Sequence, residues 1–437
     1  MADFARSADP AVQAELDLLA KLSPGFDQLG LDRIERLLDR LGRPQDRLPP
    51  AIHVAGTNGK GSVCAFLRAA LEAAGQNVHV YTSPHLVRFN ERIRLAGKLV
   101  PDAELAQLLK EVREASVGIE PSFFEATTAA AFLAFARTPA DAAIIEVGLG
   151  GRLDATNVID QPLVTGIASL GIDHQQFLGR RLIDIAGEKA GIARRGVPLI
   201  TQRYPGRIAE RIAAIARDAG AYWLPRSGDW NVGIRQDRLH YRDAQGELNL
   251  PIPRLAGGHQ LLNAGLAIAL LRHQDRLKAP PSALGAAMGW ADWPARLQRL
   301  ASGPLTGLLP QGSELWVDGG HNPAAARLVA DWVRDDWGGA GTPTHLLFAA
   351  LQSKDAAGLL KPFAGLVDMV HTLPIEGHDC RDPRALADMA RAMGFKAHPR
   401  ETIGQALAAI RTPSRVLVFG SLYLAGEALA ANGSIPD

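Results

Sequence analysis

The sequence is poor in cysteine, in net charge and in long apolar runs, and each shortage excludes a class of protein. Its two cysteines, Cys64 and Cys380, lie far apart and form neither a metal-ligand nor a disulfide pattern. Basic side chains number 47 and acidic ones 46, so a net charge of +1 indicates no nucleic-acid or membrane-surface partner. The longest apolar stretch, residues 129–136, is far below the roughly 20 residues that a membrane span needs.

The first residues, 1–6, lack the basic and then apolar arrangement of a secretory signal, so we expect a cytoplasmic protein with small-molecule partners. At 437 residues the chain exceeds a comfortable single core, and two domains are expected. Glycine and proline punctuate residues 303–312, which favours a boundary there. We predict domains over 1–300 and 301–437.

The strongest local signal is the stretch 51–62. An apolar run enters it, glycines crowd its centre, and a helical pattern over 63–74 follows, which predicts strand, tight loop and helix. Backbone N–H groups of such a loop point into one concavity, beside the positive end of the helix. Lys60 could then reach phosphate oxygens, and Ser62 could offer its hydroxyl to magnesium. Gly61 separates the two, unlike the usual G-x-x-x-x-G-K-[ST], and a glycine-rich turn with a solvated lysine is the alternative.

Strand, loop and helix patterns alternate along the chain, which predicts an α/β fold with a doubly wound parallel sheet. A near-continuous apolar run, as a sheet covered on both faces requires, occurs at 142–147, and further strands are predicted at 78–81 and 163–169. Region 197–253 is predicted to hold strand-like pieces and turns, followed by a helix over 259–272. Four later strand candidates predict a smaller α/β domain: 315–318, 345–350, 369–373 and 416–419.

Polar residues follow the predicted strands of the first domain, where ligands of such sheets gather. Ser83, Glu146 and His174 could hold a magnesium ion beside Lys60, because magnesium prefers oxygen ligands and shares them with phosphates. Each residue also has a plainer explanation. A Ser-Pro pair is more often a turn, and an Asp-His pair after a strand is more often a local cap.

Two further features have open alternatives. Lys189 lies on a small-residue helix, where it could be functional or merely solvated. Asp318 and His321 follow a strand of the second domain and could meet the first domain across a cleft. The same segment could be a turn whose following helix has Asn322 as N-cap and Pro323 at its first position, and both descriptions can hold.

The chain resembles the folylpolyglutamate synthase/dihydrofolate synthase family of the Mur ligase superfamily. The motifs that carry the resemblance occur in fixed order at 53–62, 81–86, 146–157, 173–174, 188–192, 258–264, 318–323 and 420–424. The resemblance implies a P-loop-type ATPase domain joined to a Rossmann-like C-terminal domain. It further implies an ATP-dependent amide ligase that adds L-glutamate to dihydropteroate and to the γ-carboxyl of tetrahydrofolate through an acyl phosphate.

The resemblance also implies roles for particular residues. ATP contacts are implied for Asn58, Gly59, Lys60, Gly61, Ser62, Asn263, Arg296 and Asp318. Magnesium ligands are implied for Ser83, Glu146 and His174, and a carbamylated side chain for Lys189. The pterin side is implied for Leu29, Gly30, Leu31, Ser122, Phe123, Phe124, Glu125, Leu153, Asp154 and Ala155. The expected catalytic set is Lys60, Glu146, His174, Lys189, Asp318 and His321.

Cofactor expectations follow from the same resemblance: Mg²⁺ and ATP, with room for a monovalent cation such as K⁺, in a monomer. Two residues depart from the family pattern. Ala295 stands where glycine usually precedes Arg296, and Gly320 replaces a common alanine. The rival functions are another Mur-type ligase, which adds an amino acid to a UDP-muramyl substrate, and a P-loop kinase or switch NTPase. The preferred folate acceptor and the length of the glutamate tail stay open.

Overall fold

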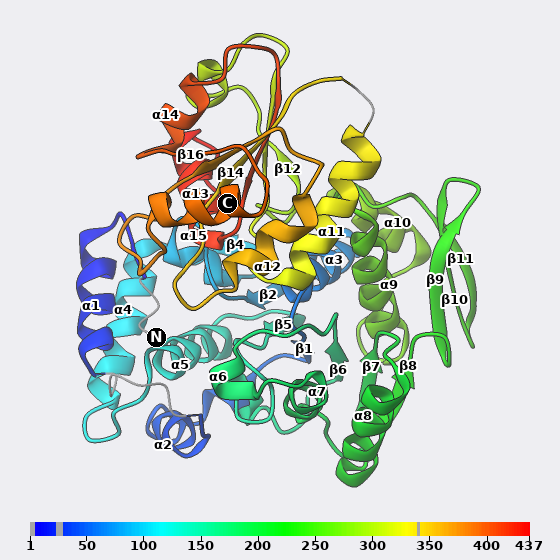
Figure 1. Cartoon of the computed structure of the whole chain (residues 1–437). Helices are drawn as coiled ribbons and strands as arrows, with labels where there is room; N and C mark the ends of the chain where they lie inside the picture. The colour runs from blue at the N-terminus through cyan, green and yellow to red at the C-terminus, as the bar shows by residue number, and fades with distance from the viewer. Residues whose placement is uncertain (1–4, 23–28, 339–340) are drawn as a thin grey trace. The chain divides into compact units, whose positions relative to one another are not determined.

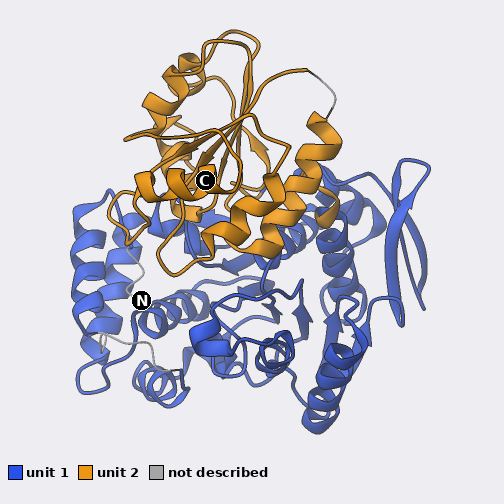
Figure 2. Ribbon diagram, viewed as in Figure 1, with its two compact units in different colours: residues 1–254, 260–292, 437 blue, residues 255–259, 293–436 orange. Residues whose placement is uncertain are grey.

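The computed structural model describes residues 5–22, 29–338 and 341–437, and the chain divides into two units (Figure 2). Unit 1 comprises Met1–Arg254, Gln260–Asp292 and Asp437, and unit 2 comprises Leu255–His259 and Trp293–Pro436. The glycine- and proline-punctuated stretch at 303–312 therefore lies within unit 2. The division into functional domains at 300/301 stays a prediction.

Unit 1 is built on an eight-stranded sheet with the order β4-β3-β2-β5-β1-β6-β7-β8 (Figure 1). The strands from β2 to β8 in that order run parallel, and β3 and β4 form an antiparallel edge. Every residue of β1 and β5 is buried, as predicted for a sheet covered on both faces. The strands are β1 Ala51–Ala55, β2 Val78–Tyr81, β3 Ile93–Leu95, β4 Lys98–Leu99, β5 Ala142–Glu146, β6 Val164–Ile167, β7 Pro198–Thr201 and β8 Tyr222–Pro225.

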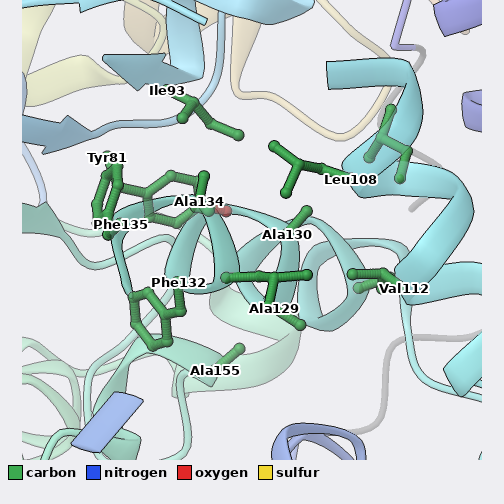
Figure 3. Close-up of a cluster of buried hydrophobic side chains, with 14 of the residues drawn as sticks. Tyr81, Ile93, Leu108, Val112, Ala129, Ala130, Phe132, Ala134, Phe135 and Ala155 are labelled. Atoms are coloured by element: carbon green, nitrogen blue, oxygen red, sulfur yellow. The ribbon is translucent and has the colours of Figure 1, made fainter. Parts of the chain in front are cut away.

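Helices cover both faces of this sheet (Figure 1). They are α1 Pro10–Leu22, α2 Asp32–Arg40, α3 Lys60–Ala73, α4 Asp102–Ala115, α5 Phe123–Arg137, α6 Gln175–Leu178, α7 Leu182–Ala190, α8 Gly206–Ala219, α9 Gly258–Arg272 and α10 Pro281–Trp290. The apolar stretch 129–136 is the C-terminal half of α5, which is buried among side chains of β2, β3 and α4 (Figure 3). The stretch is apolar on all sides because the helix lies inside the core.

The prediction of only strand-like pieces and turns over 197–253 is wrong. Helix α8 occupies the middle of this region, and its buried residues Ile208, Ile212 and Ala216 recur every four positions. That spacing is helical, but arginines on the solvent side of the helix interrupt the apolar pattern in the sequence. A separate antiparallel sheet follows α8, made of β9 Trp230–Arg235, β10 Arg238–Asp243 and β11 Gly246–Leu250.

Unit 2 is a smaller α/β unit with the strand order β12-β13-β17-β14-β15-β16. All four predicted strands are present and parallel, and the short strands β12 and β16 complete the sheet, β12 running antiparallel. The strands are β12 Gln298–Arg299, β13 Glu314–Val317, β14 Thr344–Phe348, β15 Met369–Thr372, β16 Ala397–Pro399 and β17 Arg415–Phe419. The helices are α11 Pro323–Trp332, α12 Ala356–Leu360, α13 Pro383–Ala392, α14 Ile403–Ala408 and α15 Leu422–Ala431. No helix within the described ranges of either unit is long and apolar enough to cross a membrane.

Candidate active site

The loop after β1 has the backbone that phosphate binding requires. Helix α3 begins at Lys60, three residues before the predicted helical pattern, so Lys60 and Ser62 lie in its first turn. Gly56 and Gly59 have φ values of 151° and 86°, which favour glycine. A Cβ at Gly59 would lie 2.5 Å from Oδ1 of Asn263, so the absence of a side chain also lets α9 approach the loop. The N-terminus of α3 therefore lies at the carboxyl edge of the sheet, where the N–H groups of its first turn can bind an anion.

Three predicted residues meet beside this loop. The Nζ of Lys60 lies 3.6 Å from Oε1 of Glu146, and both side chains are largely buried. The backbone N–H of Ser83 donates to Oε2 of Glu146 at 3.3 Å. The buried Oγ of Ser62 has no hydrogen-bond partner within the described part of the chain. A buried hydroxyl without a partner is costly, and a bound phosphate or cation would supply one.

His174 lies along the same edge, after β6. The N–H groups of Thr57 and Asn58 both donate to the carbonyl of Ser169, at 2.8 and 3.2 Å, which joins the phosphate loop to the segment leading to His174. His174 has a left-handed backbone, with φ of 49°, at the N-cap position of α6. Its backbone N–H donates to Oδ1 of Asp173 at 2.9 Å, and its imidazole does not cap the helix. The plain cap function therefore does not account for the imidazole.

Lys189 is buried rather than solvated. Only 4% of the residue is exposed, and its Nζ donates to the carbonyl of Gly56 at 3.0 Å. Burial, assisted by the positive charge of Lys60, lowers the pKa of Lys189 to about 7, although Asp154 and Asp173 oppose this shift. Near neutral pH a large share of this side chain is therefore an uncharged amine. The alternative of a solvated helix lysine is excluded.

The segments predicted for the pterin side are joined by an ion pair. Ser122 and Glu125 form a capping box at the start of α5, with reciprocal hydrogen bonds of 3.2 and 2.7 Å. Glu125 also accepts two hydrogen bonds from the guanidinium of Arg33, at 3.0 and 2.8 Å. Arg33 lies on α2, directly after the predicted segment Leu29–Leu31, so the pair brings together residues 92 positions apart.

The other predicted pterin-side residues are divided between core and surface. Phe123, Asp154 and Ala155 are buried, whereas Leu29, Gly30, Leu31, Phe124 and Leu153 are partly exposed. The ring of Phe124 lies over Gly148, because a Cβ at Gly148 would lie 2.3 Å from it. Oδ2 of Asp154 accepts a hydrogen bond from the N–H of Leu149 at 2.8 Å. Asp154 therefore holds the glycine-rich loop from inside.

In unit 2, the predicted turn follows β13. The carboxylate of Asp318 is 4% exposed and accepts hydrogen bonds from the N–H groups of Leu297, at 2.9 Å, and Gly320, at 2.7 Å. Burial raises the pKa of Asp318, and the charge of Arg296 acts in the opposite direction. His321 donates from Nδ1 to the carbonyl of Gly319 at 3.0 Å, so in a neutral ring Nε2 is an acceptor.

Asn322 and Pro323 begin α11 as predicted. Oδ1 of Asn322 accepts from the N–H of Ala325 at 3.0 Å, and Pro323 occupies the first helical position. Ala295, the departure from the family glycine, has φ of 55° and is fully buried. The backbone at this position therefore does adopt the conformation that favours glycine.

The predicted magnesium ligands do not form a complete cage from protein side chains. Across the described residues, no group of three His, Cys, Asp or Glu is placed to hold a metal ion. The predicted set contains only Glu146 and His174 from these residue types. Such a partial oxygen-rich set, beside the unpartnered hydroxyl of Ser62, fits magnesium, which usually shares its coordination with nucleotide phosphates and water.

Sequence reasoning missed Gln260 as a site residue. Its Oε1 accepts a hydrogen bond from Nδ2 of Asn263 at 3.0 Å, which orients Asn263 against Gly59. The buried Nε2 of Gln260 has no partner among the described residues. The available signal was the three-residue spacing of the two amides, which places both on one helix face.

A glycine loop at the carboxyl edge of a parallel sheet, with a buried lysine–carboxylate pair beside it, fits the phosphates of a nucleoside triphosphate, so the fold and the site define the class of nucleotide-binding α/β proteins. The family model described as "Dihydrofolate synthetase, C-terminal domain" matches residues 307–431. Folylpolyglutamate synthase of Lacticaseibacillus casei is 32% identical over 412 residues, 90% of this chain and 92% of that protein. The chain belongs to the folylpolyglutamate synthase/dihydrofolate synthase family.

Solved structures give the same result. Escherichia coli FolC in complex with DHPP and ADP is 32% identical, has a TM-score of 0.86, and the match covers 98% of both chains. A bifunctional folylpolyglutamate synthase/dihydrofolate synthase with Mn, AMPPNP and L-glutamate bound is 31% identical, with a TM-score of 0.84 over 98% of this chain and 99% of that chain. The predicted family, fold class and ligase class are confirmed.

Proposed function

We propose that this chain adds L-glutamate both to dihydropteroate, giving dihydrofolate, and to the γ-carboxyl of tetrahydrofolate, giving polyglutamates. The observation that carries the proposal is the phosphate loop, where the Lys60–Glu146 pair lies beside the unpartnered hydroxyl of Ser62. The relatives support the choice of substrates, because one is a complex with DHPP and ADP and another holds AMPPNP and L-glutamate.

The chemistry explains why a phosphate loop serves an amide ligase. A free carboxylate is a poor acylating agent, because its leaving group would be oxide. A carboxylate oxygen of the pterin acid attacks the γ-phosphorus of ATP, ADP leaves, and an acyl phosphate forms. The amine of glutamate then attacks the acyl carbon, loses a proton, and the tetrahedral intermediate collapses to the amide and inorganic phosphate. The protein contributes mainly positioning and neutralisation of charge.

In this scheme Asn58, Lys60 and the N–H groups of Gly59, Gly61 and Ser62 bind the phosphates of ATP, and the Lys60 ammonium offsets charge on the transferred group. Ser83, Glu146 and His174 would hold Mg²⁺, which when bound supplies further charge neutralisation. Asn263, Arg296 and Asp318 contact the nucleotide, and His321 completes the catalytic set. A monovalent cation such as K⁺ is an additional candidate.

Lys189 is proposed to be carbamylated. Only the neutral amine attacks carbon dioxide, forming an N–C bond and releasing a proton, and a pKa of about 7 makes that form available. The product is an anion that accepts hydrogen bonds where a cation stood. Leu29–Leu31, Ser122–Glu125 and Leu153–Ala155 are proposed to form the pterin side. We further propose that the protein acts as a cytoplasmic monomer.

One assay tests the function against its rivals. ATP hydrolysis by the purified chain is measured with dihydropteroate alone, L-glutamate alone and both, and then with tetrahydrofolate or a UDP-muramyl substrate in place of dihydropteroate. We expect ADP release only when glutamate and a pterin acid are both present, with a glutamylated product from each acceptor. Hydrolysis that needs neither substrate would indicate a switch NTPase, and turnover with the UDP-muramyl substrate would indicate another Mur-type ligase.

A further inference from the structure

Three buried polar residues form a chain of hydrogen bonds from the central strand to the glycine-rich loop. His53 lies on β1, Asp154 closes the loop that follows β5, and Thr156 lies in the short 3₁₀ turn Ala155–Val158. Their exposed fractions are 1%, 2% and 0%. Three polar side chains in the core are costly unless each is satisfied by the others.

The available protons determine which of the three side chains donates and which accepts in each hydrogen bond. Burial raises the pKa of Asp154, but two backbone N–H groups donate to its oxygens and favour the carboxylate. A carboxylate only accepts, so the hydroxyl of Thr156 donates its single proton to Oδ1 of Asp154. The oxygen of Thr156 must then accept from Nε2 of His53, at 2.8 Å. Burial lowers the pKa of His53 to about 3, so the ring is neutral and carries its proton on Nε2. His53 therefore orients Thr156, and Thr156 orients Asp154.

In this orientation the carboxylate of Asp154 accepts hydrogen bonds from backbone N–H groups at both ends of the loop. Its Oδ2 accepts the N–H of Leu149 at 2.8 Å, and its Oδ1 accepts the N–H of Thr156 at 3.0 Å. One carboxylate thus closes the loop on itself. A different rotamer of Asp154 would release both backbone donors inside the protein.

The closed loop in turn contacts the helix that carries Lys189. The N–H of Arg152 donates to the carbonyl of Glu188 at 2.8 Å. A Cβ at Gly151 would lie 3.0 Å from Cα of Lys189, so loop and helix are in direct contact. The loop also holds Leu153, which is partly exposed. Its position therefore bears on both the pterin side and the lysine.

We propose that His53 and Thr156 are positioning residues of this ligase, which act through Asp154 to hold the loop 148–156 in the shape that binds the pterin acid. Neither residue touches the reacting atoms in this scheme. The proposal rests on the proposed pterin-side function of the loop, and it predicts an effect on one substrate rather than on all.

Two matched pairs of variants test it. Thr156→Val keeps the shape of the side chain and removes the hydroxyl, whereas Thr156→Ser keeps the hydroxyl. His53→Gln places an amide N–H near the position of Nε2, whereas His53→Asn places it near Nδ1. KM for dihydropteroate and for ATP, kcat and the melting temperature are measured for each full-length variant.

We expect Thr156→Val and His53→Asn to raise KM for dihydropteroate roughly tenfold, the scale of one lost buried hydrogen bond, with KM for ATP within about twofold of wild type. Thr156→Ser and His53→Gln should keep KM for dihydropteroate within about threefold. If Thr156→Val does not fold, the two His53 variants decide the question.

An equal rise in KM for dihydropteroate in both members of a pair would overturn the proposal. So would a lower melting temperature with unchanged KM values, because these hydrogen bonds would then have only a structural role. A wild-type chain that does not glutamylate dihydropteroate would instead overturn the proposed function, and the positioning proposal with it. The two failures are distinguishable, because the first appears only in the variants.

Discussion

The carboxyl edges of the two sheets differ in whether their buried polar groups have hydrogen-bond partners within the protein. In unit 1 the hydroxyl of Ser62 lacks a partner among the described residues, and the pKa of Lys189 is lowered to about 7. In unit 2 both oxygens of Asp318 accept backbone N–H groups, and Asn322 caps its helix. At the first edge, polar groups stay available to bind a ligand. At the second edge, the Asp318 and Asn322 side chains use hydrogen-bond acceptors to hold the turn and the helix start. Substitutions at the first edge should therefore affect mainly activity, whereas substitutions at the second should also lower stability directly.

Lys60→Ala should cause the largest loss of activity among substitutions at the carboxyl edge of the unit 1 sheet. Glutamylated product should fall by at least about 10²–10³-fold, because the ammonium offsets charge on the transferred phosphoryl group. The chain should still fold, but its melting temperature should fall, because the buried carboxylate of Glu146 loses its cation. Product formation is measured by chromatography, with the exposed Lys110→Ala on α4 as control. Near-normal turnover would remove Lys60 from the phosphate loop.

Lys189→Ala should lower kcat roughly 10–100-fold, the usual cost of removing a group that supports a metal or its ligands. Short carboxylates such as acetate or propionate should restore part of the activity, because they can occupy the space of a carbamate. The assay is initial rate against carboxylate concentration, with chloride as the ionic-strength control. A variant as active as the wild type would leave Lys189 as a buried lysine without a chemical role.

Lys189 should also make stability depend on pH. Its folded-state pKa of about 7 lies below the ordinary 10.5, so the unfolded chain binds more protons between these values. The free energy of unfolding should therefore rise with pH across this window, by at most about 1.4 kcal/mol per pH unit, and Lys189→Met should lack this contribution. Urea unfolding in CO₂-free buffer at pH 7, 8 and 9 compares the two proteins, with Lys110→Met as control. Identical pH slopes in the two proteins would contradict the lowered pKa of Lys189 in the folded state.

Asp318→Asn tests the carboxyl edge of the unit 2 sheet, where we expect a loss of stability. The amide keeps one acceptor oxygen but not two, so one of the N–H groups of Leu297 and Gly320 loses its partner. We expect a loss of about 1–3 kcal/mol in the free energy of unfolding, in addition to any loss of activity. Denaturant titration measures it, and the exposed Asp331→Asn should cost less than about 1 kcal/mol. Unchanged stability would mean that the turn does not depend on the carboxylate.

Ala295→Gly should have the smallest effect. Glycine relieves the left-handed backbone, worth about 1–2 kcal/mol, but it adds freedom to the unfolded chain and removes a buried methyl group, each worth up to about 1 kcal/mol. The terms nearly cancel, so stability should stay within about 1 kcal/mol of wild type. A gain well above this would show that the methyl group is strained in its surroundings.

Most secondary structure was predictable because apolar residues recur with the period of the element that buries them. The strand pattern at 78–81 coincides with β2, and Ser122 begins α5 as its N-cap. Prediction failed at α8, whose buried positions recur every four residues but lie next to charged residues in the sequence, and at the short strands β12 and β16, which have too few residues to show a period.

The sequence by itself determined the residue types of the site, because a glycine loop followed by lysine, and polar residues after strands, are local features of parallel sheets. Only the tertiary structure decided that Arg33 pairs with Glu125 across 92 positions, that Lys189 is buried against Gly56, and that His53 orients Thr156. Burial and hydrogen-bond direction depend on what packs around a group. Those neighbours come from distant segments, and no local pattern records them.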